Sequence, residues 1–543
     1  MSAEAYLLRQ SNADLRNTKD LLMKRRTIDR RQDDNGGLYS GGGVKHTLSN
    51  LTTNTQELST QQSGFEGDFI TTVTSTRDFS TEAICAHMVA SKKGCHDYLS
   101  HCVLAINETS VSQIPTNYKN TDNHIRILTE YSVDDVVTKG SQLNFAKNNY
   151  KSFKYNGATS PNGAGECANK ILETTLTPAD GNTQGVEVND GIMKRCSSTN
   201  NYLNTETSKY CTSLEERNMS EYIYTTRVLT FVHKVFIPLT CFHEIFRVMP
   251  MVKNLYIKMH SFFHTVKFDL EYVHHVDAAQ ATLTQTNVVS NHDYCPIMIT
   301  PIGEGWDFAV RGDATLNVSF GLRQGGGAVT NFVSVLYDMT TETERSYISN
   351  PERLLVYNEC FTDEKIFTSK KIKWKIHDAI PKPRYLIIQT QAGNNGLATP
   401  SSTGTDVVSI DNSCFTPSLC MMGTSYTNMN ILNGSNRLYS EDISNYNWQM
   451  FQELLHAKSL NGDMTTGMTS GQITEDMFTS GIFAFHVFKL NSLDDALGDD
   501  TDRPITFIAT NNSLVPTLKL KAFLYYETSL KINVNNAQLT MSN

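Results

Sequence analysis

The chain has 543 residues, of which 39% are hydrophobic, and this is enough for about two to four domains with sizeable cores. Charged residues make up only 19%, which excludes a disordered polyelectrolyte and a highly charged coiled coil. The 47 basic and 56 acidic residues give a net charge of −9, which excludes a basic nucleic-acid-binding surface over the whole protein. Any contact with nucleic acid must therefore be local.

The cysteines and the first residues indicate where the protein is made. Eleven cysteines cannot all pair within one chain, so most are expected to be free thiols. Residues 1–10 lack the apolar core and cleavage site of a signal peptide, and the most apolar stretch, 228–242, is too short to span a bilayer. The sequence therefore predicts a soluble protein that is synthesised in the cytosol.

The first 45 residues form a segment of their own. Apolar residues are interspersed among basic residues from 2 to 31, and this segment contains no Pro or Gly, which predicts a basic helical arm. Glycines at 36–37 and 41–43 then predict a flexible hinge. The other interpretation of the arm is a frayed terminus. Its basic residues are Arg16, Lys19, Lys24, Arg25, Arg26, Arg30 and Arg31.

The middle and the end of the chain predict mainly β-strands. Residues 69–74 and 125–131 look like strands, whereas 147–200 has the composition of a loop. Beyond residue 220 the pattern alternates with period two, as in 371–376, where Ile372, Trp374 and Ile376 share one face. Helical spacing is confined mainly to 242–249 and 448–455, and it makes Trp448, like Trp374, a predicted core residue.

Few helices and long polar loops indicate an all-β protein built from antiparallel β-sandwiches. Polar residues interrupt the strand pattern at 277–293. We therefore expect a first domain at 46–280, a second domain at 290–537 and a C-terminal tail at 538–543.

The order of short motifs in the second half resembles a known family. Residues 353–357 (RLLVY), 371–376 (KIKWKI) and 382–390 (KPRYLIIQT) are followed by 431–434 (ILNG), a helix at 446–455, and strands at 481–488 and 519–526; upstream, 236–239 (FIPL) leads to 255–258. This succession resembles the major capsid proteins of Polinton (Maverick) elements, adintoviruses and virophage-like viruses. The resemblance covers residues 225–535, while residues 1–220 match in length and position only.

The resemblance implies a fold, an assembly and a location. The two domains would be tandem jelly rolls, a double jelly roll with few short helices and long loops. Three chains would form a pseudo-hexameric capsomer of an icosahedral virion shell, a structural role without enzymatic activity or cofactor. The expected partners are two further copies of the chain, neighbouring capsomers, penton and minor capsid proteins. Synthesis in the host cytosol and assembly in the cytoplasm or nucleus follow from the same resemblance.

The basic arm is the segment that we expect to act locally. In an otherwise acidic chain, its positive charge suits an anionic layer beneath the shell: the genome, an inner membrane or acidic minor proteins. The hinge would let one arm adopt different geometries at different lattice positions.

Other sequence patterns give weak support for a metal site, a protease site or a receptor-binding motif. Cys85, His87, Cys95 and Cys102 offer zinc ligands, but their spacing fits no standard finger, and ordinary buried thiols are the favoured interpretation. His260 and His264 lie in a strand-like pattern without the glutamate of a metalloprotease. The acidic run 494–502 lacks the spacing of a calcium loop, and the tripeptide 311–313 (RGD) arises often by chance.

The competing interpretation is a secreted or cell-surface protein, either a carbohydrate-binding β-sandwich or a two-jelly-roll hydrolase. The sequence lacks a Gly-x-Ser-x-Gly elbow and a phosphate-binding loop. The absence of a signal peptide and the unpaired thiols also disfavour this class. A monomer in solution would favour it.

Overall fold

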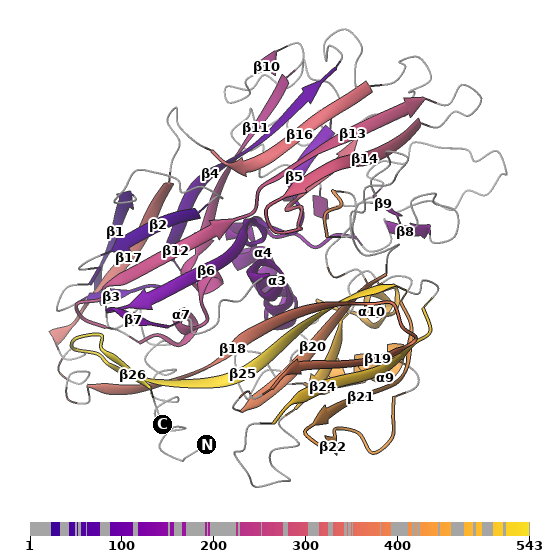
Figure 1. Cartoon of the computed structure of the whole chain (residues 1–543). Helices are drawn as coiled ribbons and strands as arrows, with labels where there is room; N and C mark the ends of the chain where they lie inside the picture. Colours follow the sequence, from indigo (N-terminus) through magenta and orange to yellow (C-terminus); the bar gives the residue numbers. More distant parts are fainter. Residues whose placement is uncertain are drawn as a thin grey trace.

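The structure is a computed structural model of the whole chain. It describes residues 23–32, 43–48, 51–52, 56–60, 62–76, 87–111, 118–149, 153–156, 166–169, 191–192, 194–195, 224–225, 228–250, 252–274, 281–301, 314–323, 330–341, 345, 349, 351–378, 380, 382–392, 411–414, 419, 421, 424–443, 446–457, 472–481, 485–490, 503–513 and 517–541. Within these residues, antiparallel strands form two sandwiches, one from each half of the chain (Figure 1).

The first sandwich has one large sheet and one smaller sheet among the described residues. The large sheet contains β1 (Met23–Gln32), β3 (Gln56–Leu58), β4 (Gly64–Ser75), β10 (Tyr224–Thr225), β11 (Val228–Pro238), β13 (Val266–His274), β14 (Ala281–Ser290), β16 (Ala314–Leu322) and β17 (Thr330–Met339). The smaller sheet has the order β2 (Gly43–Leu48), β12 (Ile257–Phe263), β6 (Leu99–Ile106) and β7 (Thr109–Ser110). Two further pairs join β5 (His87–Ser91) to β15 (Ile297–Pro301) and β8 (Phe153–Asn156) to β9 (Glu166–Asn169).

Aromatic rings fill the space between the two sheets of the first sandwich. Phe65 and Phe69 on β4 lie 4.8 and 5.2 Å from Phe263 on β12, measured between ring centroids. His46 on β2 packs edge-on against Phe65 at 5.9 Å. These residues belong to one buried core, so the alternating pattern of β12 places one face inward and one outward.

The second sandwich has the strand order of a jelly roll. One sheet runs β18 (Glu352–Phe367), β25 (Leu518–Asn533), β20 (Pro383–Ala392), β23 (His486–Lys489), and β26 (Leu539–Met541) also pairs with β25. The facing sheet runs β19 (Lys371–His377), β24 (Ile505–Asn511), β21 (Tyr426–Asn433), β22 (Asn436–Arg437). From β18 to β25 the chain changes sheet at every step except between β21 and β22, which is the strand order of a jelly roll built from two Greek keys.

Helices occupy few positions in the part of the chain that the structure describes. They are η1 (Cys95–Tyr98), α3 (Lys119–Glu130), α4 (Val133–Gln142), α6 (Leu239–Phe242), α7 (Ile245–Val248), α9 (Tyr446–His456) and α10 (Glu475–Thr479). Figure 1 shows α3 and α4 in the space between the two sandwiches. Among the described helices, none is both long and apolar enough to cross a membrane.

The predicted fold class is confirmed: the chain is all-β, with tandem antiparallel sandwiches. The predicted boundary at 277–293, with a second domain from 290, is wrong, because β14, β15, β16 and β17 all pair with strands of the first sandwich. The second sandwich begins only at β18. Residues 281–290 resemble a linker because their sequence is polar, yet they form the edge strand β14, in which Gln285 and Thr286 are buried.

The prediction of a strand at 125–131 is wrong, because these residues belong to α3 and to the loop that follows it. Ile125, Ile127 and Leu128 are buried, but so are Arg126 and Thr129. Polar and apolar residues of α3 are buried alike, and the alternation of Ile125 and Ile127 around Arg126 suggests a strand.

The prediction of a basic helical arm is also wrong for the part of the arm that the structure describes. Residues 23–32 form β1, which pairs antiparallel with β17 from Met23↔Met339 to Gln32↔Asn331. The predicted tail 538–543 likewise includes β26, which pairs with β25. Residues 1–22 and 33–42 lie outside the described residues, whereas Gly43, the last glycine of the predicted hinge, begins β2.

The two tryptophans differ. Trp374 is 1% exposed, as predicted, and its Nε1 donates a hydrogen bond to Asp363 Oδ2 at 3.1 Å. Trp448 lies on the predicted helix, α9, but is 56% exposed, so its assignment to the core is wrong. The helix buries Phe451 and Leu454 of the predicted stripe together with Met450, whereas Leu455, like Trp448, is exposed.

This difference gives a matched pair of substitutions. Trp374→Ala should lower the free energy of unfolding by about 3–5 kcal/mol, because it leaves a cavity between the sheets of the second sandwich. Trp448→Ala should change it by no more than about 0.5 kcal/mol. Denaturant unfolding of both variants measures the difference, and equal effects would contradict the assignment of the buried face of α9.

Candidate functional site: a buried ionic cluster between the two sandwiches

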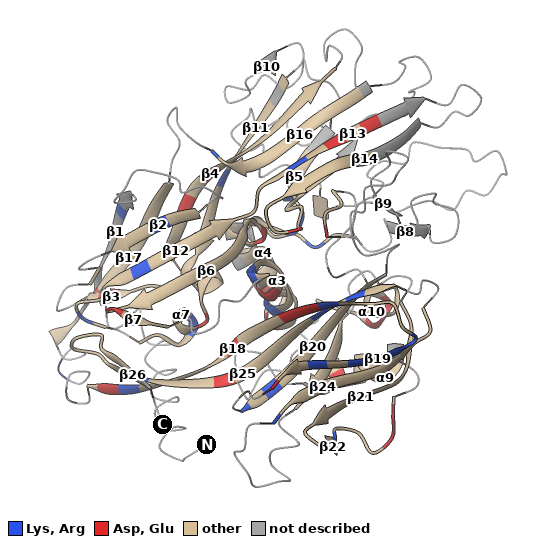
Figure 2. Ribbon diagram, viewed as in Figure 1, with Lys and Arg blue, Asp and Glu red and all other residues tan. Residues whose placement is uncertain are grey.

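The largest group of buried charges lies around α3, between the two sandwiches. We call it the α3 cluster and define it as Lys119, Asp122, Arg126, Glu130, Glu244 and Arg247. Three basic and three acidic side chains therefore face each other in this small region. Figure 2 shows basic and acidic positions along the ribbon of α3. All six come from the first half of the chain, on α3 and on the segment that contains α6 and α7.

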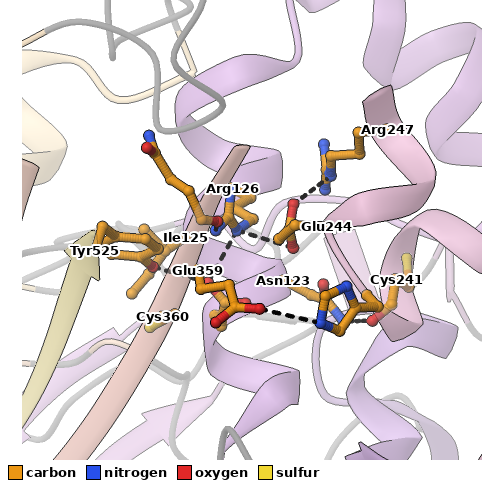
Figure 3. Close-up of polar contacts among 12 residues, drawn as sticks. Asn123, Ile125, Arg126, Cys241, Glu244, Arg247, Glu359, Cys360 and Tyr525 are labelled. Atoms are coloured by element: carbon orange, nitrogen blue, oxygen red, sulfur yellow. Dashed lines mark hydrogen bonds and ion pairs between the residues drawn. The ribbon is translucent and has the colours of Figure 1, made fainter. Parts of the chain in front are cut away.

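Arg126 is at the centre of the α3 cluster and is fully buried. Its Nε lies 3.0 Å from Asp122 Oδ1, one helical turn earlier, and 3.2 Å from Glu244 Oε1 (Figure 3). A second nitrogen, Nη1, lies 3.8 Å from Glu130 Oε1. A buried guanidinium needs this number of partners, because its five donors lose their hydration together.

The other two cations complete the cluster. Lys119 Nζ lies 2.7 Å from Asp122 Oδ2 and 2.9 Å from Glu244 Oε1. Arg247 bridges the remaining carboxylates, at 2.9 Å from Glu130 Oε2 and 2.7 Å from Glu244 Oε2. Glu244 thus contacts all three cations and ties the α6–α7 segment to α3.

The second sandwich contributes aromatic and backbone partners to the same place. Tyr525 on β25 donates a hydrogen bond to Asp122 Oδ1 at 2.8 Å, and its ring lies 5.0 Å from the guanidinium carbon of Arg126. Arg126 Nη2 donates to the backbone oxygen of Asn358 on β18 at 3.1 Å. The cluster is therefore neutralised by the first sandwich and closed by the second.

A smaller pair lies beside the cluster. His243 Nε2 is 3.6 Å from Glu359 Oε1 on β18, and Tyr526 donates a hydrogen bond to Glu359 Oε2 at 2.6 Å. Burial lowers the pKa of His243 to about 3, with a further contribution from Lys119. The imidazole is therefore neutral at physiological pH, and its Nδ1 accepts the backbone N–H of Ile245 at 3.1 Å.

Electrostatics keeps the central carboxylates ionised. Burial alone raises the pKa of Asp122, but Arg126 and Lys119 outweigh it and hold that pKa below its usual value. The pKa of Glu244 is lowered in the same way, against burial, by Arg126, Arg247 and Lys119. Carboxylates with a lowered folded-state pKa stabilise the fold above their unfolded pKa of about 4 and lose this contribution as the pH falls further.

A second contact between the sandwiches forms at Asp411, in the loop between β20 and β21. Its side chain pairs with Lys521 on β25 and accepts a hydrogen bond from Gln391 Nε2 at 2.6 Å. Its backbone oxygen accepts from the Cys295 amide at 2.9 Å and from Lys92 Nζ at 3.3 Å, both in the first sandwich. The loop therefore reaches across the boundary between the two sandwiches.

The predicted arm residues lie partly on β1. Lys24, Arg25, Arg26, Arg30 and Arg31 belong to this strand, whereas Arg16 and Lys19 lie outside the described residues. Arg30 is exposed, and its Nε lies 3.2 Å from Glu66 Oε2 on β4. One of the seven charges therefore contacts the chain's own first sandwich.

The predicted zinc ligands do not converge where the structure describes them. Cys95 and Cys102 are buried free thiols, and burial raises the pKa of each to about 12. Cys85 lies outside the described residues, and His87 lies on β5. Within the described residues, no three His, Cys, Asp or Glu side chains are grouped as a metal site. The RGD tripeptide and the acidic run 494–502 also lie outside the described residues.

Comparisons with known proteins give likenesses of structure only. No protein-family model and no curated protein matches the sequence. A chain of the Sputnik virophage structure is 12% identical, with a TM-score of 0.47 and coverage of 96% of this chain and 89% of that chain. The mavirus major capsid protein is 11% identical (TM-score 0.44, coverage 95% and 90%), and the Faustovirus major capsid protein is 8% identical (TM-score 0.43, coverage 93% and 90%). All three of these structures are viral, and two of them are major capsid proteins by name.

The α3 cluster makes a quantitative prediction. Arg126→Met should lower the free energy of unfolding by about 3–5 kcal/mol, because it leaves buried carboxylates without their central cation. Arg437→Met is the matched control: Arg437 pairs with Asp442 at the surface, so its loss should cost no more than about 1 kcal/mol. Denaturant unfolding at neutral pH compares the two, and a small effect at both positions would contradict the central role of Arg126.

Proposed function

We propose that the chain is a viral major capsid protein whose homotrimer forms a pseudo-hexameric capsomer of an icosahedral shell. The observation that carries the proposal is the joining of two tandem β-sandwiches, the second with jelly-roll order, into one body by buried charges. A chain with two similar lobes gives six lobes when three copies close a ring. The role is structural and needs no catalytic residue.

The motifs of the second half support the proposal from the sequence side. Residues 353–357, 371–376 and 382–390 fall on β18, β19 and β20, three successive strands of the jelly roll. Residues 431–434 fall at the end of β21 and in the turn after it, where Gly434 has a φ of +63°. The motifs whose order resembles the Polinton and virophage family thus lie on β18, β19, β20 and β21, in the same order along the chain.

Exposed apolar side chains in the single chain suit further copies of it. Val133 and Val137 lie one turn apart on α4 and are both exposed, and Trp448 and Leu455 lie two turns apart on α9. Large apolar side chains grouped on one face of a helix are typical of surfaces that an oligomer covers. Neighbouring capsomers, penton and minor capsid proteins are the further proposed partners, and the virion is the proposed location.

The proposed role of the N-terminal segment is to contact an anionic layer beneath the shell. All seven basic residues remain candidates for this contact. They are Arg30, which pairs with Glu66, and six others: Arg16, Lys19, Lys24, Arg25, Arg26 and Arg31. The pairing of β1 with β17 would fix the segment's root on the first sandwich, and the residues before it would extend from there. The layer, whether genome, inner membrane or acidic minor protein, is attracted by charge, so the contact would weaken with salt.

One solution experiment tests the proposal. Light scattering of the purified protein should give three times 60.8 kDa across micromolar concentrations, and electron microscopy should show shells under assembly conditions. Replacing the six basic residues with Gln should leave the trimer intact, since β1 keeps its backbone pairing, and should make shell formation fail at lower salt than for the unchanged chain.

The control replaces Lys371, Lys373 and Lys375, which line the exposed face of β19, with Gln. This variant should form both trimers and shells. A stable monomer would contradict the capsid proposal itself, whereas unchanged shell formation by the six-residue variant would contradict only the role of the N-terminal segment.

A further inference from the structure

A lysine, a carboxyl group and an amide meet where η1 contacts the first turn of α3, beside Lys119 of the α3 cluster. Lys93 precedes η1, Asp97 lies within η1, and Asn120 is in the first turn of α3. All three are buried, with at most 2% of each residue exposed. Asp97 Oδ1 lies 3.4 Å from Lys93 Nζ and 3.4 Å from Asn120 Nδ2. One carboxyl oxygen therefore touches both the amine and the amide.

Neighbouring groups hold the amine against the start of α3 and keep water out. Lys93 Nζ lies 3.5 Å from Thr121 Oγ1, the residue that follows Asn120. The ring of Tyr294 lies 5.1 Å from Lys93 Nζ, and its hydroxyl donates a hydrogen bond to Asp97 Oδ1 at 2.7 Å. Asp97 Oδ1 thus lies between the amine and the side-chain amide, and we expect rotation of the Lys93 side chain to bring Nζ to the amide carbon.

The environment favours neutral groups at this position. Burial lowers the pKa of Lys93 to about 8, so an appreciable fraction of the amine is uncharged and nucleophilic near neutral pH. Burial raises the pKa of Asp97, although Lys93 and Tyr294 act in the opposite direction. An uncharged amine beside a protonated carboxyl group is the combination required for attack on an amide.

Two orphaned atoms indicate where the carboxyl proton acts. Asp97 Oδ2 and Asn120 Oδ1 are buried and have no hydrogen-bond partner among the described residues. An amide can be rotated so that its oxygen and nitrogen exchange places, since the two are assigned from the hydrogen-bond network. After this rotation, a protonated Asp97 donates to Asn120 Oδ1 and polarises the carbonyl group.

We propose that Lys93 and Asn120 form an intramolecular isopeptide bond, with Asp97 as the general acid and base. The neutral Lys93 Nζ attacks Cγ of Asn120, while Asp97 protonates the oxygen. Asp97 then takes a proton from Nζ and passes it to Nδ2. As the Cγ–Nδ2 bond breaks and ammonia leaves, the carbonyl group re-forms and its oxygen returns the first proton to Asp97. An amine and a primary amide become a secondary amide and ammonia, so the step needs no oxidant, energy source or co-reactant.

The bond would tie η1 covalently to α3, the helix that carries the α3 cluster. A cross-link between residues 93 and 120 closes a loop and so restricts the unfolded chain, as a disulfide does. It would do this with a bond that reducing conditions do not break, in a chain whose described cysteines are free. The inference concerns the single chain and does not depend on the capsid proposal.

Mass spectrometry of the full-length protein tests the inference. The denatured protein should be lighter than its sequence by one ammonia, and a tryptic digest should yield a branched peptide that joins Lys93 to Asn120. Lys93→Met and Asp97→Asn should both have the unmodified mass, apart from the substitution. Lys92→Met is the matched control: Lys92 lies over the same Tyr294 ring but bonds the backbone of Asp411, so this variant should lose ammonia as the unchanged chain does.

Three results would overturn the inference. The first is an unmodified mass with separate peptides after long incubation of the folded protein above pH 8. The second is an unchanged loss of ammonia in Lys93→Met or Asp97→Asn. The third is a loss of water with a link to Asp97, which would assign the bond to another partner. The first test needs no variant, so a variant that misfolds by circular dichroism does not affect it.

Discussion

The position of Arg126 constrains the arrangement of both sandwiches. A guanidinium that is removed completely from water is tolerated only when carboxylates and other acceptors surround it. Asp122 and Glu244 supply the charge from the first sandwich, and Tyr525 and the backbone of Asn358 close the site from the second. The cost of exposing these charges unpaired is what keeps α3 in the boundary between the two sandwiches.

Other features reinforce this arrangement. β18 and β25 pair along their whole length, from Glu352↔Asn533 to Phe367↔Leu518, and so present one continuous surface to the first sandwich. The end of that ribbon bonds the first sandwich through Lys253, whose amide donates to the Val534 oxygen at 2.8 Å. The loop at Asp411 makes a separate connection. Contacts at several separate points oppose relative movement of the two sandwiches.

The sequence predicted the fold class and the elements with a clear period, and it failed where the environment removes that period. The face of β19 was predictable because one side meets the core and the other meets water, so Trp374 was placed correctly. The α3 helix was not, because neighbours cover it on all sides, and Arg126 gave no sign of burial. The α3 cluster joins positions more than 100 residues apart, and only its pairs within 119–130 and within 244–247 have the three- or four-residue spacing that a sequence displays. β14 was mistaken for a linker because its sequence is polar.

Scanning calorimetry of the full-length protein tests most directly whether the buried charges join the two sandwiches into one unit. The structure predicts a single heat-absorption peak whose calorimetric enthalpy equals the van't Hoff enthalpy for the whole chain, since neither sandwich can unfold without exposing the charges of the α3 cluster. Two resolved peaks, with the second sandwich melting while the first keeps its structure, would contradict this account.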